Sequence, residues 1–282
     1  MDADYIVAIP SYKRADLCLV KTLTMLKINN ILPTNIFVYV ANDEEYCEYT
    51  SKLDSSLYNK IVIGKKGLVQ QRQFIMNQWE MNKHIVFFDD DVESIDLSLG
   101  ALPPCPRLQA ELGGEGGTAP ALDYFIKYAF NECMRLNAYI WGVYPVYNPF
   151  FRKSRKEMTT CLNYIVGAFY GLINRPNNTN LMLDLTAENS QKEDVERTLK
   201  YFIEDGIVLR FNKIGFITKY YGKSGGLGTF KERIQPMLEA SERLKKTYGD
   251  YGNIKIRKNG MAEFRLKKQG AKPHQSNSGL LL

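Results

Sequence analysis

Three consecutive carboxylates, Asp89, Asp90 and Asp91, follow the apolar run of residues 84–88. Carboxylates at the end of a buried strand repel one another unless cations or hydrogen-bond donors compensate their charge. Hard divalent cations take oxygen ligands of this kind, and a cation held there can also take phosphate oxygens. We therefore predict a divalent-cation site at Asp89 and Asp91. The alternative is a solvated acidic turn that caps the next helix.

A second set of chemically capable residues follows the first apolar run, which covers residues 5–10. Pro10 ends that run. Ser11 and Arg14 can donate hydrogen bonds to a phosphate or a base, and the Tyr12 ring can stack. Taken alone, the segment also fits an ordinary strand-to-helix turn. No dinucleotide-binding G-x-G-x-x-G and no P-loop motif occurs in the sequence.

Two further segments place charged residues near expected helix starts. Gly67 would let the backbone approach an anion at a helix N-terminus, and Arg72 follows on the same helix. Lys192, Glu193 and Asp194 stand at the start of a later helix. One of these carboxylates could act as a general base toward a hydroxyl group. Acidic residues also favour a helix N-terminus without any catalytic role.

The elements that must position these residues alternate between strand and helix in the first third of the chain. The pattern predicts strands over 5–10, 36–41, 61–63 and 84–88, separated by helices over 15–29, 43–57 and 67–79. Apolar strands in repeated βα units imply a parallel sheet that is covered on both faces. Ligands bind at the carboxyl ends of such strands. We therefore expect the segments that follow the strands to meet: 10–14, 42–43, 64–67 and 89–91.

The rest of the chain does not continue this regular alternation of strands and helices. A proline- and glycine-rich stretch at 99–120 predicts a long flexible loop. We then expect helices over 121–137, 192–205 and 229–248, strands at 139–144 and between 161 and 172, hairpins at 206–222 and 253–268, and a flexible tail over 269–282.

The composition and the charge distribution limit the classes of protein and of binding partner that fit the sequence. The chain has 282 residues, 45% hydrophobic and 24% charged, which is ordinary globular composition. With no signal-peptide pattern at the N-terminus and dispersed cysteines, we expect a cytoplasmic protein. Residues 219–282 hold 14 Lys and Arg against 5 Asp and Glu, whereas the remainder holds 23 against 26. This asymmetry predicts a polyanionic partner at the C-terminal end; a solvated basic tail is the alternative.

In this order the segments resemble the GT-A nucleotide-sugar glycosyltransferases, which join a Rossmann-like nucleotide half with a D-x-D metal motif to an acceptor half. The resemblance implies a three-layer α/β/α fold over 1–222, divided into a nucleotide-sugar half (1–98), the loop (99–120) and an acceptor half (121–222). It implies Mn²⁺ or Mg²⁺ at Asp89 and Asp91, and Asp194 as the base of an inverting transfer. The implied donor-binding residues are Pro10, Ser11, Tyr12, Arg14, Asn42, Asp43, Gly67, Arg72, Asp89 and Asp90.

The chain further resembles the TET-associated glycosyltransferases of DNA-modifying phages. The resemblance rests on I-P-S-Y-x-R at 9–14, G-L-V-x-x-R at 67–72, F-F-D-D-D at 87–91 and S-G-G-L-G at 224–228. It implies transfer from a UDP-sugar to a hydroxymethylated pyrimidine in DNA, with a basic DNA-contacting extension at 223–268. The implied DNA-contacting residues are Lys223, Ser224, Gly225, Gly226, Arg233, Arg257 and Lys258.

A target base must leave the duplex to reach a cleft, and it then stacks on aromatic side chains. The candidates for that pocket are Tyr144, Tyr147, Phe150 and Phe151. The sequence departs from many GT-A enzymes in one respect, because only His274 is available downstream as a histidine third metal ligand.

Three other functions remain open from the sequence. The chain could be a GT-A enzyme that glycosylates a glycan or another small acceptor. It could be a catalytically inactive nucleic-acid-binding relative. Nucleotidyl transfer is a further possibility, because paired carboxylates with a metal also serve that reaction.

Overall fold

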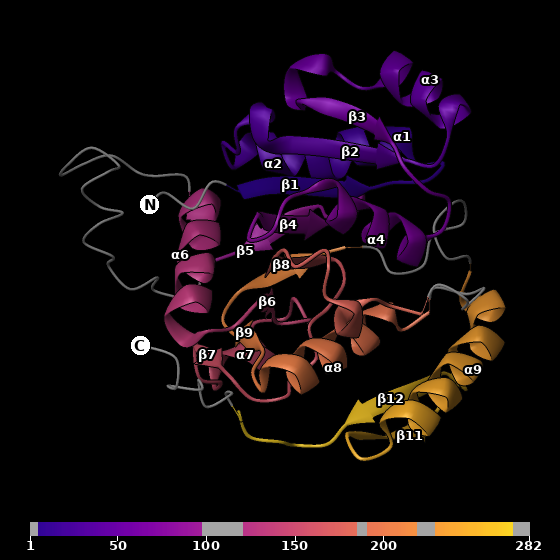
Figure 1. The fold of residues 1–282 in the computed structure, drawn as a ribbon. Coiled ribbons are helices and arrows are strands. Elements are labelled where there is room, and N and C mark those ends of the chain that lie inside the picture. The colour runs from indigo at the N-terminus through magenta and orange to yellow at the C-terminus, as the bar shows by residue number, and fades with distance from the viewer. Residues whose placement is uncertain (1–4, 98–120, 185–190, 219–228, 273–282) are drawn as a thin grey trace.

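The computed structural model describes residues 5–97, 121–184, 191–218 and 229–272. Its centre is one mixed eight-stranded sheet (Figure 1). In spatial order the strands are β3 (Lys60–Ile63), β2 (Ile36–Val40), β1 (Tyr5–Pro10), β4 (His84–Phe88), β8 (Phe169–Ile173), β6 (Ile140–Val143), β9 (Leu209–Phe211) and β7 (Met158–Thr159).

The first four strands form the predicted parallel half. β1 lies between β2 and β4, and β2 pairs with β3, all in parallel. β8 is antiparallel to β4 and joins this half to the second one. The α/β class predicted from the sequence is therefore confirmed.

Helices cover both faces of the sheet. The described helices are α1 (Ala15–Cys18), α2 (Thr24–Ile28), α3 (Asp43–Lys52), α4 (Leu68–Gln78), α6 (Ala121–Leu136), α7 (Phe150–Lys153), α8 (Glu193–Asp205) and α9 (Phe230–Tyr248). A π-helical turn, Leu19–Leu23, makes α1 and α2 one continuous helix over the predicted range. Short 3-10 turns lie at Pro33–Asn35, Ser55–Leu57 and Thr179–Leu181.

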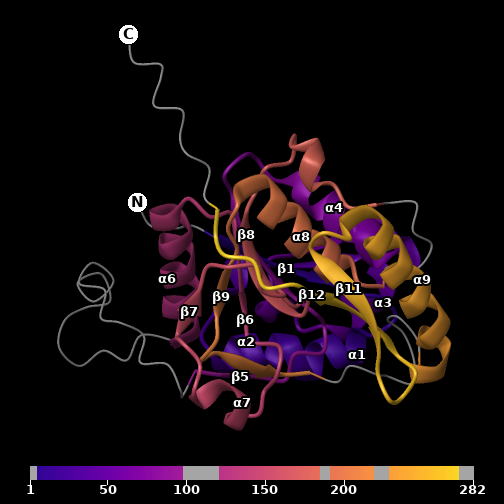
Figure 2. The ribbon, with the colours of Figure 1, turned by 90° about the horizontal axis from the view of Figure 1, so that it is seen from below.

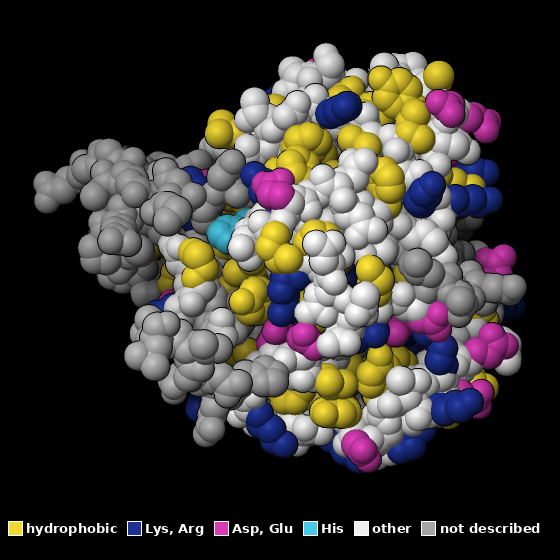
Figure 3. All heavy atoms as spheres, viewed as in Figure 1, with side chains coloured by type: hydrophobic (Ala, Val, Ile, Leu, Met, Phe, Trp, Pro, Cys, Tyr) yellow, Lys and Arg dark blue, Asp and Glu magenta, His cyan; other side chains and the backbone are white. Residues whose placement is uncertain are grey.

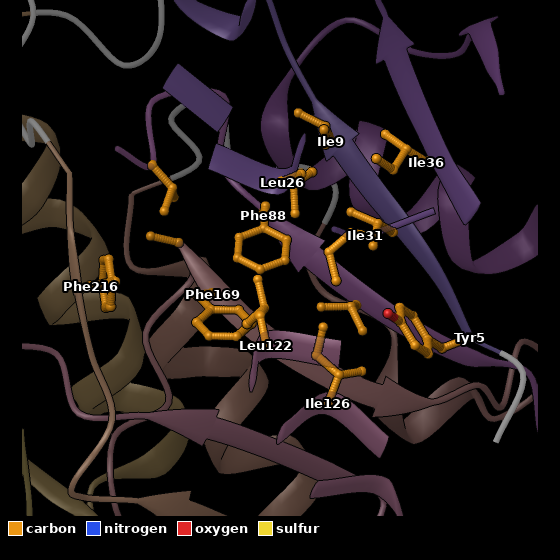
Figure 4. Close-up of a cluster of buried hydrophobic side chains, with 14 of the residues drawn as sticks. Tyr5, Ile9, Leu26, Ile31, Ile36, Phe88, Leu122, Ile126, Phe169 and Phe216 are labelled. Atoms are coloured by element: carbon orange, nitrogen blue, oxygen red, sulfur yellow. The ribbon is translucent and has the colours of Figure 1, made fainter. Parts of the chain in front are cut away.

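Because successive side chains along a strand point to opposite faces of the sheet, the hydrophobic core is divided into two clusters. Val7 and Ile9 of β1 pack with α1, α2, α3 and α6, whereas Ile6 and Ala8 pack with α4 and α8. Figure 4 shows the first cluster, in which Phe88 of β4 and Phe169 of β8 stack with ring centroids 4.3 Å apart. Burial of this apolar surface is the main force that fixes the loops at the strand ends.

Two predictions about the second half were wrong. Over the described part of the hairpin expected at 206–222, residues 206–218, β9 enters the main sheet beside β6, while β10 (Gly215–Ile217) pairs with β5 (Ser94–Asp96). The strand expected between 161 and 172 begins only at Phe169. In both cases a long-range partner decides the pairing, which local pattern does not reveal.

The C-terminal elements follow the prediction. α9 starts with a capping box between Thr229 and Glu232, and β11 (Gly252–Ile256) pairs with β12 (Ala262–Leu266). Gly260 has the left-handed φ of +84° that the hairpin turn needs. Leu244 of α9 belongs to the same core cluster as α8, so these elements pack onto the second half. Figure 2 shows them on the side of the molecule opposite α6.

Candidate functional site

A cleft of about 1060 Å³ lies where the carboxyl ends of the parallel strands meet. Its lining includes the segments after β1, β3 and β4, as predicted, together with the start of α8 and the β11–β12 hairpin. It is large enough for a ligand of nucleotide-sugar size. The cleft therefore gathers residues from both halves of the sheet and from the C-terminal end.

The three aspartates after β4 have different partners. Asp90 accepts hydrogen bonds from the Ser11 hydroxyl at 2.6 Å and from Arg14 Nη1 at 3.0 Å. Asp91 accepts one from Arg14 Nη1 at 3.3 Å and another from the Thr218 hydroxyl. Asp90 and Asp91 are thereby held by the wall of the cleft, whereas Asp89 keeps 36% of its side chain exposed.

The negative charge of this cluster is incompletely compensated. Burial, with the neighbouring carboxylates, raises the pKa of Asp89 to about 7 against the opposing effect of Arg72. Burial likewise raises the pKa of Asp90 to about 6, although Arg14 and Ser11 favour its charged form. A divalent cation would supply the missing positive charge, and the partly exposed Asp89 could receive it, whereas Asp91 would have to release Arg14 or Thr218 to become a second ligand. Within the described ranges, no three His, Cys, Asp or Glu side chains gather as a metal site. The remaining ligands would therefore come from elsewhere, such as donor phosphates and water.

A buried ion-pair network connects the aspartates to α8. Arg72 Nη2 donates to Asp89 Oδ1 at 2.9 Å, and Arg72 Nη1 donates to Glu193. The second oxygen of Glu193 accepts from Arg197 Nη1 at 2.6 Å. Tyr170 carries the Arg197 guanidinium over its ring at 3.7 Å. Because these charges are desolvated, their positions relative to one another are tightly constrained.

Gly167 shows how closely this network is packed. A Cβ at this position would lie 2.9 Å from Arg72 Nη1 and 3.0 Å from Glu193 Oε1. We expect Gly167→Ala to lower the free energy of unfolding by about 1–3 kcal/mol, as overpacking does. Gly270→Ala is the matched control, because a Cβ there meets nothing within 4 Å. Urea unfolding of both variants measures the difference; equal midpoints would contradict the expected crowding.

Asp194 lies at the start of α8 and faces the cleft. One carboxylate oxygen accepts a hydrogen bond from the Tyr164 hydroxyl, and the other accepts from the Val195 amide at 2.9 Å. Lys192, immediately before the helix, has a left-handed φ of +60°, which is uncommon for a residue other than glycine. Since both oxygens of Glu193 are in ion pairs, Asp194 is the better placed of the two carboxylates to act as a base.

The predicted donor-binding residues after β1 and β3 lie at the cleft. Pro10 and Tyr12 line it, together with Ser11 and Arg14, whose side chains bond the aspartates. Gly67 has a φ of +98° and caps α4 at the cleft, so its glycine is required by backbone conformation.

The other two predicted donor-binding residues are differently placed. The Asn42 side chain accepts a hydrogen bond from the Glu45 amide at 2.9 Å and so caps α3. Asn42 and Asp43 are outside the cleft lining, although Ala41 belongs to it. Their contact with a donor stays a prediction.

The C-terminal elements form one wall of the cleft. Arg233 and Arg257 line it, whereas Lys258 is exposed and lies outside the lining. Arg233 contacts Gln191 at 3.1 Å, and Arg257 pairs with Glu263 at 3.2 Å. The four predicted DNA-contacting residues Lys223, Ser224, Gly225 and Gly226 lie outside the described residues, as does His274.

The surface around these C-terminal elements carries both signs of charge. In Figure 3, Lys and Arg side chains alternate with Asp and Glu over the part where Figure 1 draws α9 and the hairpin. The excess of positive charge in the sequence therefore does not form a uniform basic patch on this face.

The aromatic residues expected to hold a flipped base lie away from the cleft lining. Tyr147, Phe150 and Phe151 are exposed, and Tyr144 is buried under two guanidinium groups. Tyr164 lines the cleft instead, beside Asp194. No sequence pattern marks Tyr164 as a site residue, because it is 30 residues from its partner and follows no recognisable motif.

No protein-family model and no curated protein matches the chain. Among solved structures, it is similar to residues 1–349 of S. aureus TarS, with 14% identity and a TM-score of 0.45 over 86% of this chain and 65% of that one. It is also similar to a mycobacterial protein (8% identity, TM-score 0.49, 95% and 87% covered). A third is GalNAc-T7 solved with UDP, GalNAc and Mn²⁺ (13% identity, TM-score 0.46, 83% and 48% covered). The chain thus spans less than two thirds of the TarS and GalNAc-T7 chains.

No described helix is long and apolar enough to cross a membrane.

Proposed function

We propose that this chain is a metal-dependent glycosyltransferase that moves a sugar from a UDP-sugar to the hydroxyl of a hydroxymethylated pyrimidine in DNA. The observation that carries the proposal is the meeting of two acidic groups in one cleft. Asp89–Asp91 come from the end of β4, and Asp194 comes from the start of α8. A donor diphosphate and an acceptor hydroxyl can then be held within one site.

In this mechanism Asp194 supplies the base. Its carboxylate takes the proton of the acceptor hydroxymethyl group as that oxygen attacks the anomeric carbon. The bond from the anomeric carbon to the phosphate oxygen breaks, and UDP leaves with the electron pair. A single displacement of this kind inverts the anomeric configuration. Tyr164 orients Asp194 through its hydroxyl hydrogen bond.

The donor side is assigned to the strand ends of the parallel half. Asp89 and Asp91 would hold Mn²⁺ or Mg²⁺, which when bound neutralises charge on the departing diphosphate. Arg14 and Ser11 hold Asp90 and keep the aspartate cluster in place. Gly67 brings the backbone at the N-terminus of α4 to the cleft, where its amides could bind a phosphate if the Gln70 side chain, which now lies against Gly67, moved aside.

The acceptor side faces the C-terminal wall of the cleft. Arg233 and Arg257 there can neutralise phosphates of a DNA strand, which is a sequence-independent and salt-sensitive contribution to affinity. The motifs at 9–14, 67–72, 87–91 and 224–228 support the choice of DNA over a glycan. The identity of the sugar and of the modified pyrimidine is left to experiment.

A UDP-release assay with a panel of UDP-sugars, with and without Mn²⁺ or Mg²⁺, tests the proposal. Duplexes with plain cytosine, hydroxymethylcytosine or hydroxymethyluracil are compared, and intact-mass analysis follows the DNA. We expect metal-dependent UDP release and a sugar-sized mass gain only on a hydroxymethylated duplex, because plain cytosine lacks the attacking hydroxyl.

The other outcomes separate the rival functions. Metal-dependent UDP release without any change in DNA mass would move the acceptor to a glycan or small molecule. Incorporation of the nucleotide rather than the sugar would indicate nucleotidyl transfer. DNA binding without release from any donor would favour an inactive nucleic-acid-binding protein.

A further inference from the structure

Two arginines of the second half, outside the cleft lining, have no carboxylate partner among the described residues. Arg210 of β9 is 92% buried, since its relative exposure is 8%. Arg155 lies just after α7 and is exposed. Their guanidinium carbons lie 5.3 Å and 4.6 Å from the centroid of the Tyr144 ring. Neither arginine forms an ion pair within the part of the chain that the structure describes.

The hydrogen bonds of Arg210 to the described residues involve only two of its three guanidinium nitrogens. Nε donates to Asn212 Oδ1 at 2.8 Å, and Nη1 makes a long contact of 3.4 Å with the Tyr164 carbonyl. No hydrogen bond to a described residue uses Nη2. Burial, with the nearby Arg155 charge, lowers the pKa of Arg210 to about 10. A buried cation without a carboxylate partner among the described residues is costly unless an anion joins it.

The position of this pair relates it to the acceptor. Arg210 contacts the carbonyl of Tyr164, whose side-chain hydroxyl holds Asp194. Pro145 and Val146, which follow Tyr144, line the cleft, as does Asn163. Arg155 and Arg210 are not part of the cleft lining themselves, so an anion at the arginine pair would lie behind these lining residues, on the side of the second half.

We propose that Arg155 and Arg210 form a binding site for a phosphate group of the acceptor, the phosphodiester beside the target nucleotide. Guanidinium groups bind phosphate oxygens through paired, charge-assisted hydrogen bonds. Arg210 supplies a fixed donor because it is buried, and exposed Arg155 can close on the anion from outside. The inference rests on the proposed function, because it takes the acceptor to be a phosphate-bearing chain.

The test measures binding alone, without metal, donor or hydroxymethyl group. A fluorescein-labelled single-stranded oligonucleotide is titrated with the whole protein at several salt concentrations, using wild type, Arg155→Ala and Arg210→Gln. We expect either substitution to weaken binding about tenfold, as the loss of a charge-assisted hydrogen bond does. The slope of log affinity against log salt should become shallower by about 1.

Control variants separate the site from general charge and from unfolding. Arg135→Ala removes an exposed cation from α6, which contributes no residue to the cleft lining, and should leave the slope unchanged. Arg155→Ala replaces an exposed side chain, so it keeps the test valid if Arg210→Gln lowers the melting temperature. UDP affinity is measured in parallel and should not change, because the donor phosphates lie at the other end of the cleft.

Three results would overturn the proposal: no measurable oligonucleotide binding by wild type, the same slope for Arg155→Ala and wild type, or loss of UDP affinity with DNA affinity kept. The last result would assign the arginines to the donor. Oligonucleotide binding that depends on Arg155, together with no sugar transfer to any DNA, would support this anion site and refute DNA as the glycosylated acceptor.

Discussion

Asp194→Asn will lower the rate of sugar transfer by about 10²–10⁴-fold, the usual contribution of a general base. The amide keeps the size of the carboxylate, but its single oxygen can accept from only one of Tyr164 and the Val195 amide, and it cannot take the acceptor proton. We expect UDP affinity and the melting temperature to stay near the wild-type values, because the buried ion pairs of α8 are made by Glu193 and Arg197. Single-turnover transfer to hydroxymethylated DNA measures the rate.

Asp250→Asn provides a matched control for this variant. Asp250 follows α9, is exposed and is not part of the cleft lining, so the same loss of charge there should leave the transfer rate unchanged. If Asp194→Asn transferred sugar at the wild-type rate, Asp194 would not be the base. If Asp194→Asn lost activity and unfolded at a lower temperature as well, the effect would belong to folding.

Glu193→Gln will lower the free energy of unfolding by about 3–5 kcal/mol, the range found when one partner of a buried ion pair is removed. Glu193 lies between Arg72 and Arg197, and the side chains of all three are at most 6% exposed. Its neutralisation would leave Asp89 as the remaining carboxylate in contact with Arg72 and would leave Arg197 without an ion-pair partner among the described residues. Urea unfolding measures the loss.

A second substitution tests whether charge is the cause. Glu193→Gln combined with Arg197→Met removes the cation that the first substitution leaves unpaired, and should recover part of the lost stability. Glu48→Gln is the surface control, because its pair with Lys52 is exposed and should leave the unfolding midpoint unchanged. A loss below about 1 kcal/mol for Glu193→Gln would show that the network is more hydrated than its burial indicates.

Much of the site's first half follows from local sequence. Apolar runs of three to six residues separated by amphipathic segments indicate strands covered by helices, so the parallel order could be expected. The carboxyl ends of those strands must then share one edge of the sheet. For that reason Ser11, Gly67 and Asp89 could be placed together from the sequence before any contact between them was known.

The sequence determined the element order, the acidic cluster after β4, the glycine turns and the acidic start of α8. Only the tertiary structure shows that Arg72 joins Asp89 to Glu193 and that Tyr164 holds Asp194. It alone also shows that α9 and the β11–β12 hairpin form one wall of the cleft. The physical reason is the distance along the sequence over which each kind of interaction acts. Periodicity and turn chemistry act between residues near in sequence, whereas buried charges are matched by partners up to 127 residues away, whose approach depends on packing of the whole core.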